Sequence, residues 1–464
     1  MLGTIRNIFM VGMCGAGMSG IAEILLDQGF KVSGSDKQLS EVGKRLQQLG
    51  AVLFEGHRKE NLAHDVDVLV YSSAVPMDNE EILEAQRRKI PIIRRAEMLA
   101  EVMRLKYGIG IAGTHGKTTT TSMTSLVLME GGLDPTVIVG GILHGLGGTN
   151  ARLGKGDFIV VEADEFDRSF LSLTPTIAVL TTLEVDHLDT YRDLDDIKKA
   201  FIEFANKVPF YGFVVLCHDE PSLLDIMTKL QKKKIITYGM NPQADIQAVD
   251  ISHKENTTTF TVMRGYNELG VMTMHVTGKH NVQNALASIA VGLELGIPFE
   301  KVKAGLEKFS GVYRRWEKKG EVNGIEWYDD YAHHPTECRA TLSGVKAGWR
   351  RRVVCVFQPH LFTRTRDFYE EFGKAFLLAD VLVVTDVYPS REEPIQGITG
   401  ELIAHSARQF GHKEVHYVQD KKQLPAYLLN VVKANDIVIT MGAGDINKIG
   451  QEFFNQLKMK NSSK

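Results

Sequence analysis

The sequence predicts an α/β protein of three domains in which helices cover mostly parallel sheets. Short apolar runs alternate with helical stretches along most of the chain, which is typical of strands joined by crossover helices. Several runs are apolar throughout, as expected for strands buried on both faces. The chain has 464 residues, which is long for one domain and sufficient for three of ordinary size.

The first predicted domain, residues 1–106, is Rossmann-like. NIFMVG and KVSGSD, which ends in Asp36, predict strands on either side of a helix over residues 17–29, and VDVLVYSSAV and IPIIRR predict two further strands. The turn after the first strand reads VGMCGAGMSG, and its glycines form G-x-G-x-x-G: Gly15, Gly17 and Gly20. This pattern, with Asp36 about twenty residues on, is a dinucleotide fingerprint, because glycines and a helix N-terminus cradle a pyrophosphate.

The second predicted domain, residues 107–311, is expected to be a P-loop ATPase-like unit with a mostly parallel sheet. YGIGIAG predicts a strand and KTTTTSMTSLVLMEGG a helix, and DFIVVEAD, TIAVLTTL, GFVVLC and KIITYG predict further buried strands. TTTFTVMRG and GVMTMHVTG resemble an antiparallel pair, and HNVQNALASIAVGLELG returns to helix.

The third predicted domain, residues 312–464, is again Rossmann-like. RRVVCVFQP, ADVLVVTDV and NDIVITMGAG predict buried strands that end in polar loops. In open α/β sheets ligands bind outside the carboxyl ends of the strands, so these loops are candidate binding sites.

Composition and charge argue against a nucleic-acid-binding, membrane-inserted or disulfide-linked protein. The net charge is −3, so nothing in the overall charge favours nucleic acid or an anionic membrane. The four cysteines form no C-x-x-C pair, which argues for a reducing compartment and against a disulfide framework. No signal peptide and no apolar stretch of about 18 residues is found, so we expect a cytoplasmic protein without membrane insertion.

A second glycine-rich turn, GTHGKTTTT from Gly113 to Thr121, stands between a predicted strand and helix. Its glycines allow successive amides to face a phosphate, Lys117 offers a cation to the β- and γ-phosphates, and Thr118 offers a hydroxyl to Mg²⁺. The loop is shorter than the usual pattern, because Ile111 stands where the first glycine would be. The alternative is a plain turn with a solvated lysine, which this order of residues disfavours.

Carboxylates and a histidine follow two strands of the same predicted sheet. In VVEADEFD we expect Glu162 to bind Mg²⁺ and Asp167 to be a solvated loop residue. In the next segment, DHLDTY, we expect His187 to bind the metal or a phosphate. GKHNVQN offers Asn284 to a purine edge, although capping of the following helix by Asn281 is an alternative.

The third domain carries three polar segments. Arg314 and Arg315 suit a phosphate, with a basic linker as the alternative. WYDDYAHHPTE places two histidines beside carboxylates, but no third and fourth ligand follow at zinc spacing. FQPHLFTRTR contributes His360, Arg364 and Arg366, which suit a substrate carboxylate.

These segments together identify a resemblance. GTHGKTTT, EADE, DHLDTY, GKHNVQN, FSGVYRR, DDYAHHPTE, DVYPSREEP and MGAGDI occur in one order, and the chain resembles the Mur ligases of peptidoglycan synthesis over nearly its whole length. The resemblance implies three domains for a UDP-linked substrate, ATP and an amino acid. It also implies ATP- and Mg²⁺-dependent ligation of L-alanine to the lactyl carboxylate of UDP-N-acetylmuramate through an acyl phosphate.

The resemblance also implies site residues. Those for the UDP substrate are Gly12, Gly15, Ala16, Gly17, Met18, Ser19, Asp36, Ser72 and Ser73. Those for ATP are Gly113, Thr114, His115, Gly116, Lys117, Thr118, Thr119, Asn284, Arg315 and Asp330. The residues implied for Mg²⁺ are Thr118, Glu162 and His187. Those implied for L-alanine are Tyr331, His333, His360 and Arg364. The implied catalytic residues are Lys117, Glu162, His187 and His333, the last as proton acceptor or as carboxylate ligand.

Some positions depart from the family pattern, and other functions remain open. Cys14 stands where the opening turn often has glycine, Phe166 replaces a frequent serine, and Leu361 replaces a frequent arginine. Sister ligases carry a carbamylated lysine near Lys198 and Lys199, a role that we do not assign. The alternatives are a ligase for murein tripeptide, an NAD-dependent oxidoreductase and a nucleotide-gated binding protein. We expect a monomer or weak dimer.

Overall fold

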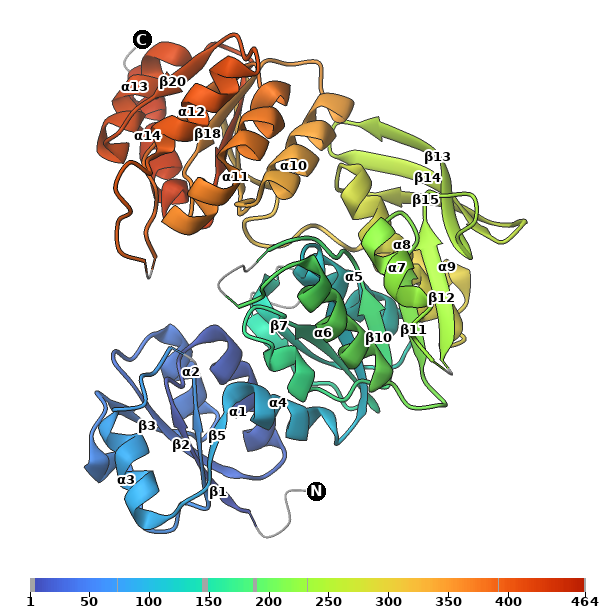
Figure 1. Ribbon diagram of the computed structural model, residues 1–464, viewed down its shortest axis with the longest axis vertical. Helices are drawn as coiled ribbons and strands as arrows, with labels where there is room; N and C mark the ends of the chain where they lie inside the picture. Colours follow the sequence, from blue (N-terminus) through green and yellow to red (C-terminus); the bar gives the residue numbers. More distant parts are fainter. Residues whose placement is uncertain are drawn as a thin grey trace. The chain divides into compact units, whose positions relative to one another are not determined.

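The computed structural model describes residues 5–72, 74–143, 149–186, 190–231, 233–390 and 392–462, and divides into two compact units. The first unit comprises Met1–Ile251, Phe260–Met272 and Asn281–Ser310, and the second comprises Ser252–Thr259, Thr273–His280 and Gly311–Lys464. The chain forms three sheets of five, ten and six strands, each flanked by helices, as predicted for an α/β protein (Figure 1). The boundaries at residues 106 and 311 stay a prediction.

The five-stranded sheet of the first unit is parallel, in the order β3-β2-β1-β4-β5. Its strands are β1 (Asn7–Val11), β2 (Lys31–Asp36), β3 (Val52–Glu55), β4 (Val68–Tyr71) and β5 (Ile92–Arg94). Its helices are α1 (Ala16–Asp27), α2 (Glu41–Gln48), α3 (Glu80–Arg88) and α4 (Arg95–Met103), with the 3₁₀ helix η1 (Lys59–Asn61). The strand order reverses beside β1, so the turn after β1 lies at the switch point where such sheets bind ligands.

The ten-stranded sheet runs in the order β15-β14-β13-β12-β11-β10-β6-β9-β7-β8. Its strands are β6 (Tyr107–Ala112), β7 (Thr136–Leu143), β8 (Thr149–Arg152), β9 (Phe158–Ala163), β10 (Ile177–Leu180), β11 (Phe213–Cys217), β12 (Lys234–Gly239), β13 (Ile246–Lys254), β14 (Thr257–Arg264) and β15 (Asn267–Met274). Its helices are α5 (Lys117–Glu130), α6 (Leu194–Asn206), α7 (Pro221–Met227), α8 (Lys279–Glu294) and α9 (Phe299–Glu307), with η3 (Ser169–Ser172).

The pairing in this sheet agrees with the apolar pattern of its strands. β6 pairs in parallel with β9 and β10, and all three are almost wholly buried. β14 and β15 are neighbours joined by two residues, a connection that only antiparallel strands allow, so the antiparallel pair is confirmed. The sequence did not predict β13 or the antiparallel pair of β7 and β8.

The six-stranded sheet belongs to the second unit and runs β16-β17-β21-β18-β19-β20, with only β16 antiparallel to its neighbour. Its strands are β16 (Glu317–Val322), β17 (Ile325–Asp330), β18 (Val353–Phe357), β19 (Val381–Val384), β20 (Val415–Tyr417) and β21 (Ile437–Met441). Its helices are α10 (Pro335–Gly348), α11 (Phe362–Ala375), α12 (Gly400–Gln409), α13 (Leu424–Val431) and α14 (Ile446–Ser462), with η4 (Phe376–Leu378) and η5 (Lys421–Gln423). Apolar side chains of β18, β19 and β21 are buried on both faces of this sheet.

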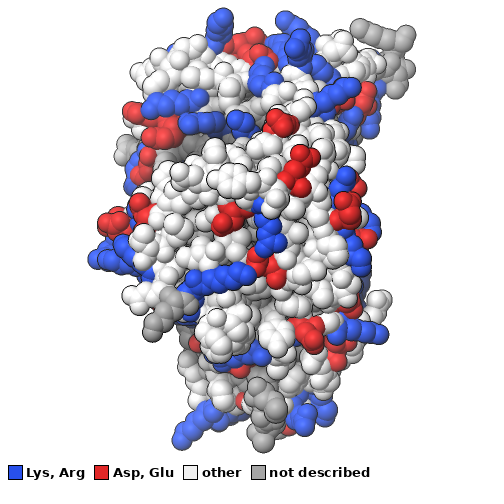
Figure 2. Space-filling view, turned by 90° about the vertical axis from the view of Figure 1, so that its right-hand side faces the viewer, with Lys and Arg blue, Asp and Glu red and all other residues white. Residues whose placement is uncertain are grey.

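The surface carries charges of both signs. On the face shown in Figure 2, Lys and Arg side chains are interspersed with Asp and Glu side chains, without a continuous area of one sign on the part drawn in colour. Within the described ranges, no helix combines the length and the apolar character that a membrane span requires.

Candidate active site

The opening turn is held in shape by the end of β2. The amides of Gly12 and Met13 donate to the carbonyl of Ser35 at 2.8 and 3.1 Å, and the amide of Cys14 donates to Asp36 Oδ2 at 2.8 Å. Gly12 has φ +79°, a conformation that side chains disfavour. Asp36 therefore fixes the turn through Cys14, whichever side chain stands at that position.

The three glycines of the fingerprint have three different neighbours. Gly15 precedes α1, and the amides of Met18 and Ser19 donate to its carbonyl. A Cβ at Gly17 would lie 2.9 Å from Nη1 of Arg95, and a Cβ at Gly20 would lie 2.9 Å from the Cβ of Ala151 in β8. Gly20 thus allows α1 to pack on the ten-stranded sheet of the same unit.

A pocket of about 260 Å³ extends from this turn to the end of β9. One wall is formed by the turns and helices at the carboxyl edge of the five-stranded sheet and includes Gly15, Gly17, Met18, Ser72 and Arg95. The other wall is formed by the ten-stranded sheet and includes Ile138, Val139, Gly140, Glu162, Asp164 and Phe170. The predicted UDP-substrate residues Gly15, Gly17, Met18 and Ser72 therefore line the same pocket as the predicted metal ligand Glu162. Ala16 begins α1, and Ser73 lies outside the described residues.

The second glycine-rich turn connects β6 to α5 at the centre of the ten-stranded sheet. Gly116 has φ +81° directly before α5, and Gly113 has φ +151° with no room for a Cβ beside Thr181. The end of β10 holds the loop: Thr182 accepts from the amides of Thr114 and His115 at 3.1 and 2.8 Å, and Thr181 Oγ1 donates to the carbonyl of His115 at 2.5 Å. The loop is thereby fixed at the helix N-terminus, where an anion is favoured.

Lys117 does not extend into solvent. Its Nζ donates to the carbonyls of Gly113 and Thr114 at 2.7 and 3.2 Å and forms an ion pair of 2.8 Å with the buried carboxylate of Glu165. Burial acts to lower the pKa of Lys117, but the carboxylate of Glu165 and two nearby carboxylates outweigh it and raise this pKa above its usual value. The solvated lysine considered for this loop is therefore not what the structure has. No role was predicted for Glu165, although it belongs to the segment VVEADEFD.

Thr118 and Glu162 lie together as the metal prediction requires. Thr118 Oγ1 donates to Glu162 Oε1 at 2.9 Å, and the amide of Gly140 donates to the other carboxylate oxygen at 2.7 Å. A hydroxyl and a carboxylate at this distance are oxygen donors of the kind that Mg²⁺ takes, so the residues fit the ion. The third predicted ligand, His187, lies outside the described residues. Thr119 is buried in the first turn of α5.

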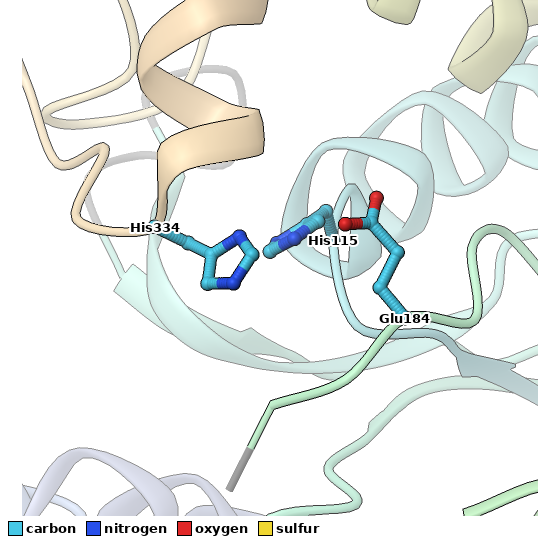
Figure 3. A group of neighbouring side chains, drawn as sticks. All are labelled: His115, Glu184 and His334. Atoms are coloured by element: carbon cyan, nitrogen blue, oxygen red, sulfur yellow. The ribbon is translucent and has the colours of Figure 1, made fainter. Parts of the chain in front are cut away.

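His115 has an acidic environment. Its imidazole and the carboxylate of Glu184 lie side by side, with ligand atoms within 4.8 Å of each other (Figure 3). The amide of Glu184 donates to Thr114 Oγ1 at 3.0 Å. Burial and the charge of Glu184 raise the pKa of the neighbouring Glu220 to about 7. The loop thus follows β6 and bonds to the residues after β10, and Glu220 after β11 lies close enough for its pKa to respond to His115 and Glu184.

Asn284 reaches the phosphate loop from α8. Its Oδ1 accepts from Thr120 Oγ1 at 3.1 Å, and a Cβ at Gly116 would lie 2.5 Å from the same oxygen. Asn284 is 6% exposed, and its binding of ATP stays a prediction. Because α8 begins at Lys279, Asn281 is the third residue of the helix and not its N-cap.

In the second unit, Glu337 organises the residues after β17. It accepts from Arg315 Nη1 at 3.0 Å and from the amide of His333 at 3.0 Å. Burial raises the pKa of Asp330 to about 6, while its carboxylate accepts from the amides of Trp316 and Ala332. His334, also labelled in Figure 3, caps α10 by accepting from the amide of Thr336. No role was predicted for Glu337, the last residue of the segment WYDDYAHHPTE.

The two adjacent arginines have different partners. Arg314 Nε donates to Asp329 at 2.8 Å, and its Nη atoms donate to the carbonyls of Gly442 and Gly444. Arg314 therefore holds the MGAGDI loop after β21, whereas Arg315 pairs with Glu337. Both lie over the ring of Tyr331, at 5.2 and 5.4 Å.

Three of the four residues predicted for the amino acid form one aromatic row. The rings of Tyr331 and His333 are 5.2 Å apart, those of His333 and His360 are 5.8 Å apart, and His360 stacks on Tyr388. Burial lowers the pKa of His333 to about 4, and the charge of the buried Arg364 adds to this. Leu361 has φ +71° between His360 and α11, a strained conformation for a branched side chain.

The sequence matches three profiles of one protein family. The profile described as "Mur ligase family, catalytic domain" matches residues 7–107, the Mur ligase middle domain matches residues 111–292, and "Mur ligase, glutamate ligase domain" matches residues 314–444. The chain belongs to the Mur ligase family.

The similar relatives are mostly of one kind. UDP-N-acetylmuramate–L-alanine ligase of Geotalea uraniireducens is 54% identical over 99% of both chains, and that of Salinibacter ruber is 52% identical over 98% of this chain and 96% of the relative. Among solved structures, UDP-N-acetylmuramate-alanine ligase MurC of Thermotoga maritima has a TM-score of 0.79 at 30% identity, covering 99% of this chain and 100% of the other. A murein peptide ligase of Psychrobacter arcticus has a TM-score of 0.69 at 26% identity, over 97% and 98%.

Proposed function

We propose that this chain ligates L-alanine to the lactyl carboxylate of UDP-N-acetylmuramate, with ATP and Mg²⁺, in the synthesis of a peptidoglycan precursor. The observation that carries the proposal is the position of Glu162, whose carboxylate accepts from Thr118 of the phosphate loop and lines the pocket that begins at the opening turn. The names of relatives that match over the full chain support the substrates.

The opening turn is assigned to the UDP substrate and not to NAD. A turn that offers glycines and a helix N-terminus binds a diphosphate of any nucleotide. The pocket continues from the turn to Glu162, so a substrate held at the turn points its far end toward the residues of phosphate transfer. A nicotinamide cofactor would leave those residues without a purpose.

The phosphate loop is assigned to ATP. Lys117 would bind the β- and γ-phosphates, and Thr118 and Glu162 would hold Mg²⁺, which when bound neutralises the charge that develops on the transferred phosphoryl group. To reach a phosphate, Lys117 must exchange its contact with Glu165 for one with the nucleotide. The lactyl carboxylate would then attack the γ-phosphorus and displace ADP, which gives an acyl phosphate that must be kept from water. The neutral amine of alanine would attack the acyl carbon, form the amide bond and expel inorganic phosphate.

His333 is assigned as acceptor of the amine proton. Its Nδ1 lies 2.9 Å from the carbonyl of Tyr331, which can only accept, so Nδ1 carries the ring proton and Nε2 has the free lone pair. With its pKa lowered to about 4, the ring is neutral at physiological pH, so the Nε2 lone pair is available, while the low pKa makes it a weak base. Arg364 would bind the carboxylate of alanine and so aim its amine.

The test is substrate-dependent release of phosphate. Purified protein receives ATP, Mg²⁺, UDP-N-acetylmuramate and either L-alanine or the murein tripeptide as acceptor. We expect phosphate release only when both UDP-N-acetylmuramate and L-alanine are present. Faster turnover with the tripeptide would assign the chain to the recycling ligases, and release without any acceptor would contradict ligation.

A further inference from the structure

Arg95 occupies a position that the sequence did not single out. It is the first residue of α4 and directly follows β5, so it lies at the same carboxyl edge of the five-stranded sheet as the opening turn. Its side chain extends across Gly17: a Cβ there would lie 2.9 Å from Nη1, 3.1 Å from Cδ and 3.3 Å from Cζ. Glycine at this position leaves room for the guanidinium group against the turn.

Arg95 has no directly bonded charged partner within the described residues. Arg95 forms no hydrogen bond and no ion pair with any of them, although it is half-buried and lines the 260 Å³ pocket. Its neighbour Arg94 is exposed and donates to the hydroxyl of Tyr71. An arginine held against a glycine-rich turn without a counter-charge is arranged for an anion that arrives from outside.

We propose that Arg95 binds the diphosphate of the nucleotide-sugar substrate, together with the amides at the start of α1. This inference rests on the proposed function and adds a charged group to it. The turn supplies neutral donors alone, whereas a guanidinium group offers two parallel N–H donors and a full charge to a pair of phosphate oxygens. Arg95 would therefore supply the positive charge at the opening turn, as Lys117 would at the phosphate loop.

The position of Arg95 favours the diphosphate over the carboxylate of the same substrate. The guanidinium group lies against Gly17, at the start of α1, where a phosphate is expected. The reacting carboxylate belongs at the opposite wall of the pocket, beside Glu162 and Gly140. The two anions can be separated experimentally, because UDP has only the first.

The experiment compares ligand affinities of the full-length protein by calorimetry. Dissociation constants for UMP, UDP, UDP-N-acetylglucosamine and UDP-N-acetylmuramate are measured for the wild type, Arg95→Ala, Arg95→Lys and the control Arg94→Ala. We expect Arg95→Ala to weaken the three diphosphates equally, by about 10- to 100-fold, since a bond to a charged group is at stake. Arg95→Lys keeps the charge but loses the two parallel N–H donors, so its dissociation constants lie between those of the wild type and Arg95→Ala. The dissociation constants of Arg94→Ala equal those of the wild type.

The ratio of the UMP and UDP dissociation constants gives the sharpest readout. This ratio falls in Arg95→Ala by about 10- to 100-fold if Arg95 binds the second phosphate, because UMP lacks that phosphate, and the amides of the turn keep the ratio above 1. An unchanged ratio, or a loss restricted to UDP-N-acetylmuramate, would overturn the inference, the second result by assigning Arg95 to the carboxylate. A wild type that binds none of the UDP ligands would instead overturn the proposed function. Unchanged thermal unfolding of Arg95→Lys shows that the fold is intact.

Discussion

The two glycine-rich turns of the first unit share a backbone design and differ in their charged residue. Both connect a buried strand to a helix, and in both a neighbouring strand end fixes the loop, through Ser35 in the first and Thr182 in the second. The first turn has an arginine without a partner among the described residues, whereas the second has Lys117 paired with Glu165. Arg95, which we propose only binds a substrate, needs no partner before that substrate binds. Lys117, which would contact the phosphate that is transferred, is held in position by Glu165 until the nucleotide binds.

The largest effect is expected from Lys117→Ala. The substitution removes the cation that faces the γ-phosphate, so kcat for phosphate release falls by at least about 10²-fold, as for the loss of a transition-state donor. Lys44→Ala, which changes an exposed lysine on α2, serves as the control and retains activity. Wild-type turnover of Lys117→Ala would show that the second turn is not the site of phosphate transfer.

Glu165→Gln tests whether the ion pair holds Lys117 in the absence of nucleotide. Breaking a buried pair leaves its partner uncompensated, so the nucleotide-free variant loses about 3 kcal/mol of stability. ATP with Mg²⁺ should restore much of this loss, because phosphate replaces the carboxylate as the partner of Lys117. Thermal unfolding with and without the nucleotide measures both. A nucleotide-induced rise in Tm no larger than that of the wild type would contradict this role of Glu165.

The opening turn is tested by comparing Gly20→Ala with Gly17→Ala. A Cβ at position 20 meets the Cβ of Ala151, which is fixed in β8, whereas a Cβ at position 17 meets the end of a flexible arginine. Gly20→Ala should therefore cost about 1–3 kcal/mol of stability through overpacking, and Gly17→Ala clearly less. Chemical denaturation of the two variants checks the order. The reverse order would show that α1 does not rely on Gly20 to pack against β8.

The smallest expected effect is a pH dependence at the base of the phosphate loop. The pKa of Glu220 is raised to about 7 in the folded chain, above the ordinary value of 4.5, so the folded state binds its proton more tightly than the unfolded state. Its contribution to stability is present below pH 4.5 and is lost as the pH rises through 7. Because the group is partly solvated, the loss amounts to at most about 1 kcal/mol. Unfolding from pH 4 to 8 should show this slope in the wild type and not in Glu220→Gln.

Sequence patterns predicted the features that depend on short stretches of chain. The buried strands around β6, β9 and β10 were recognisable because each is a continuous apolar run between turns. Lys117 and Thr118 were predictable because the phosphate loop carries its own glycine, lysine and hydroxyl within a few residues. The β7–β8 pair lacked such a signal, since TVIVGGIL and TNAR contain glycine or polar residues in short strands.

The residues that were missed act over long separations in sequence. Glu165 pairs with a lysine 48 residues earlier, and Arg95 lies against Gly17 from a different strand and helix. Neither contact has a local pattern, because the sheet brings together strand ends that are distant in the chain. Glu337 had a partial signal: Pro335 and Glu337 are the first and third residues of α10, where proline and glutamate are favoured, although His334 is not a usual N-cap residue.

The division of labour between the two turns is tested most directly by a cross-comparison of binding. Calorimetry measures the dissociation constants of UDP-N-acetylmuramate and of a non-hydrolysable ATP analogue for Lys117→Ala and for Arg95→Ala. We predict that Lys117→Ala loses affinity for the ATP analogue alone and that Arg95→Ala loses affinity for UDP-N-acetylmuramate alone. Loss of the same ligand in both variants, or displacement of UDP-N-acetylmuramate from the wild type by NAD, would contradict the assignment of the two turns.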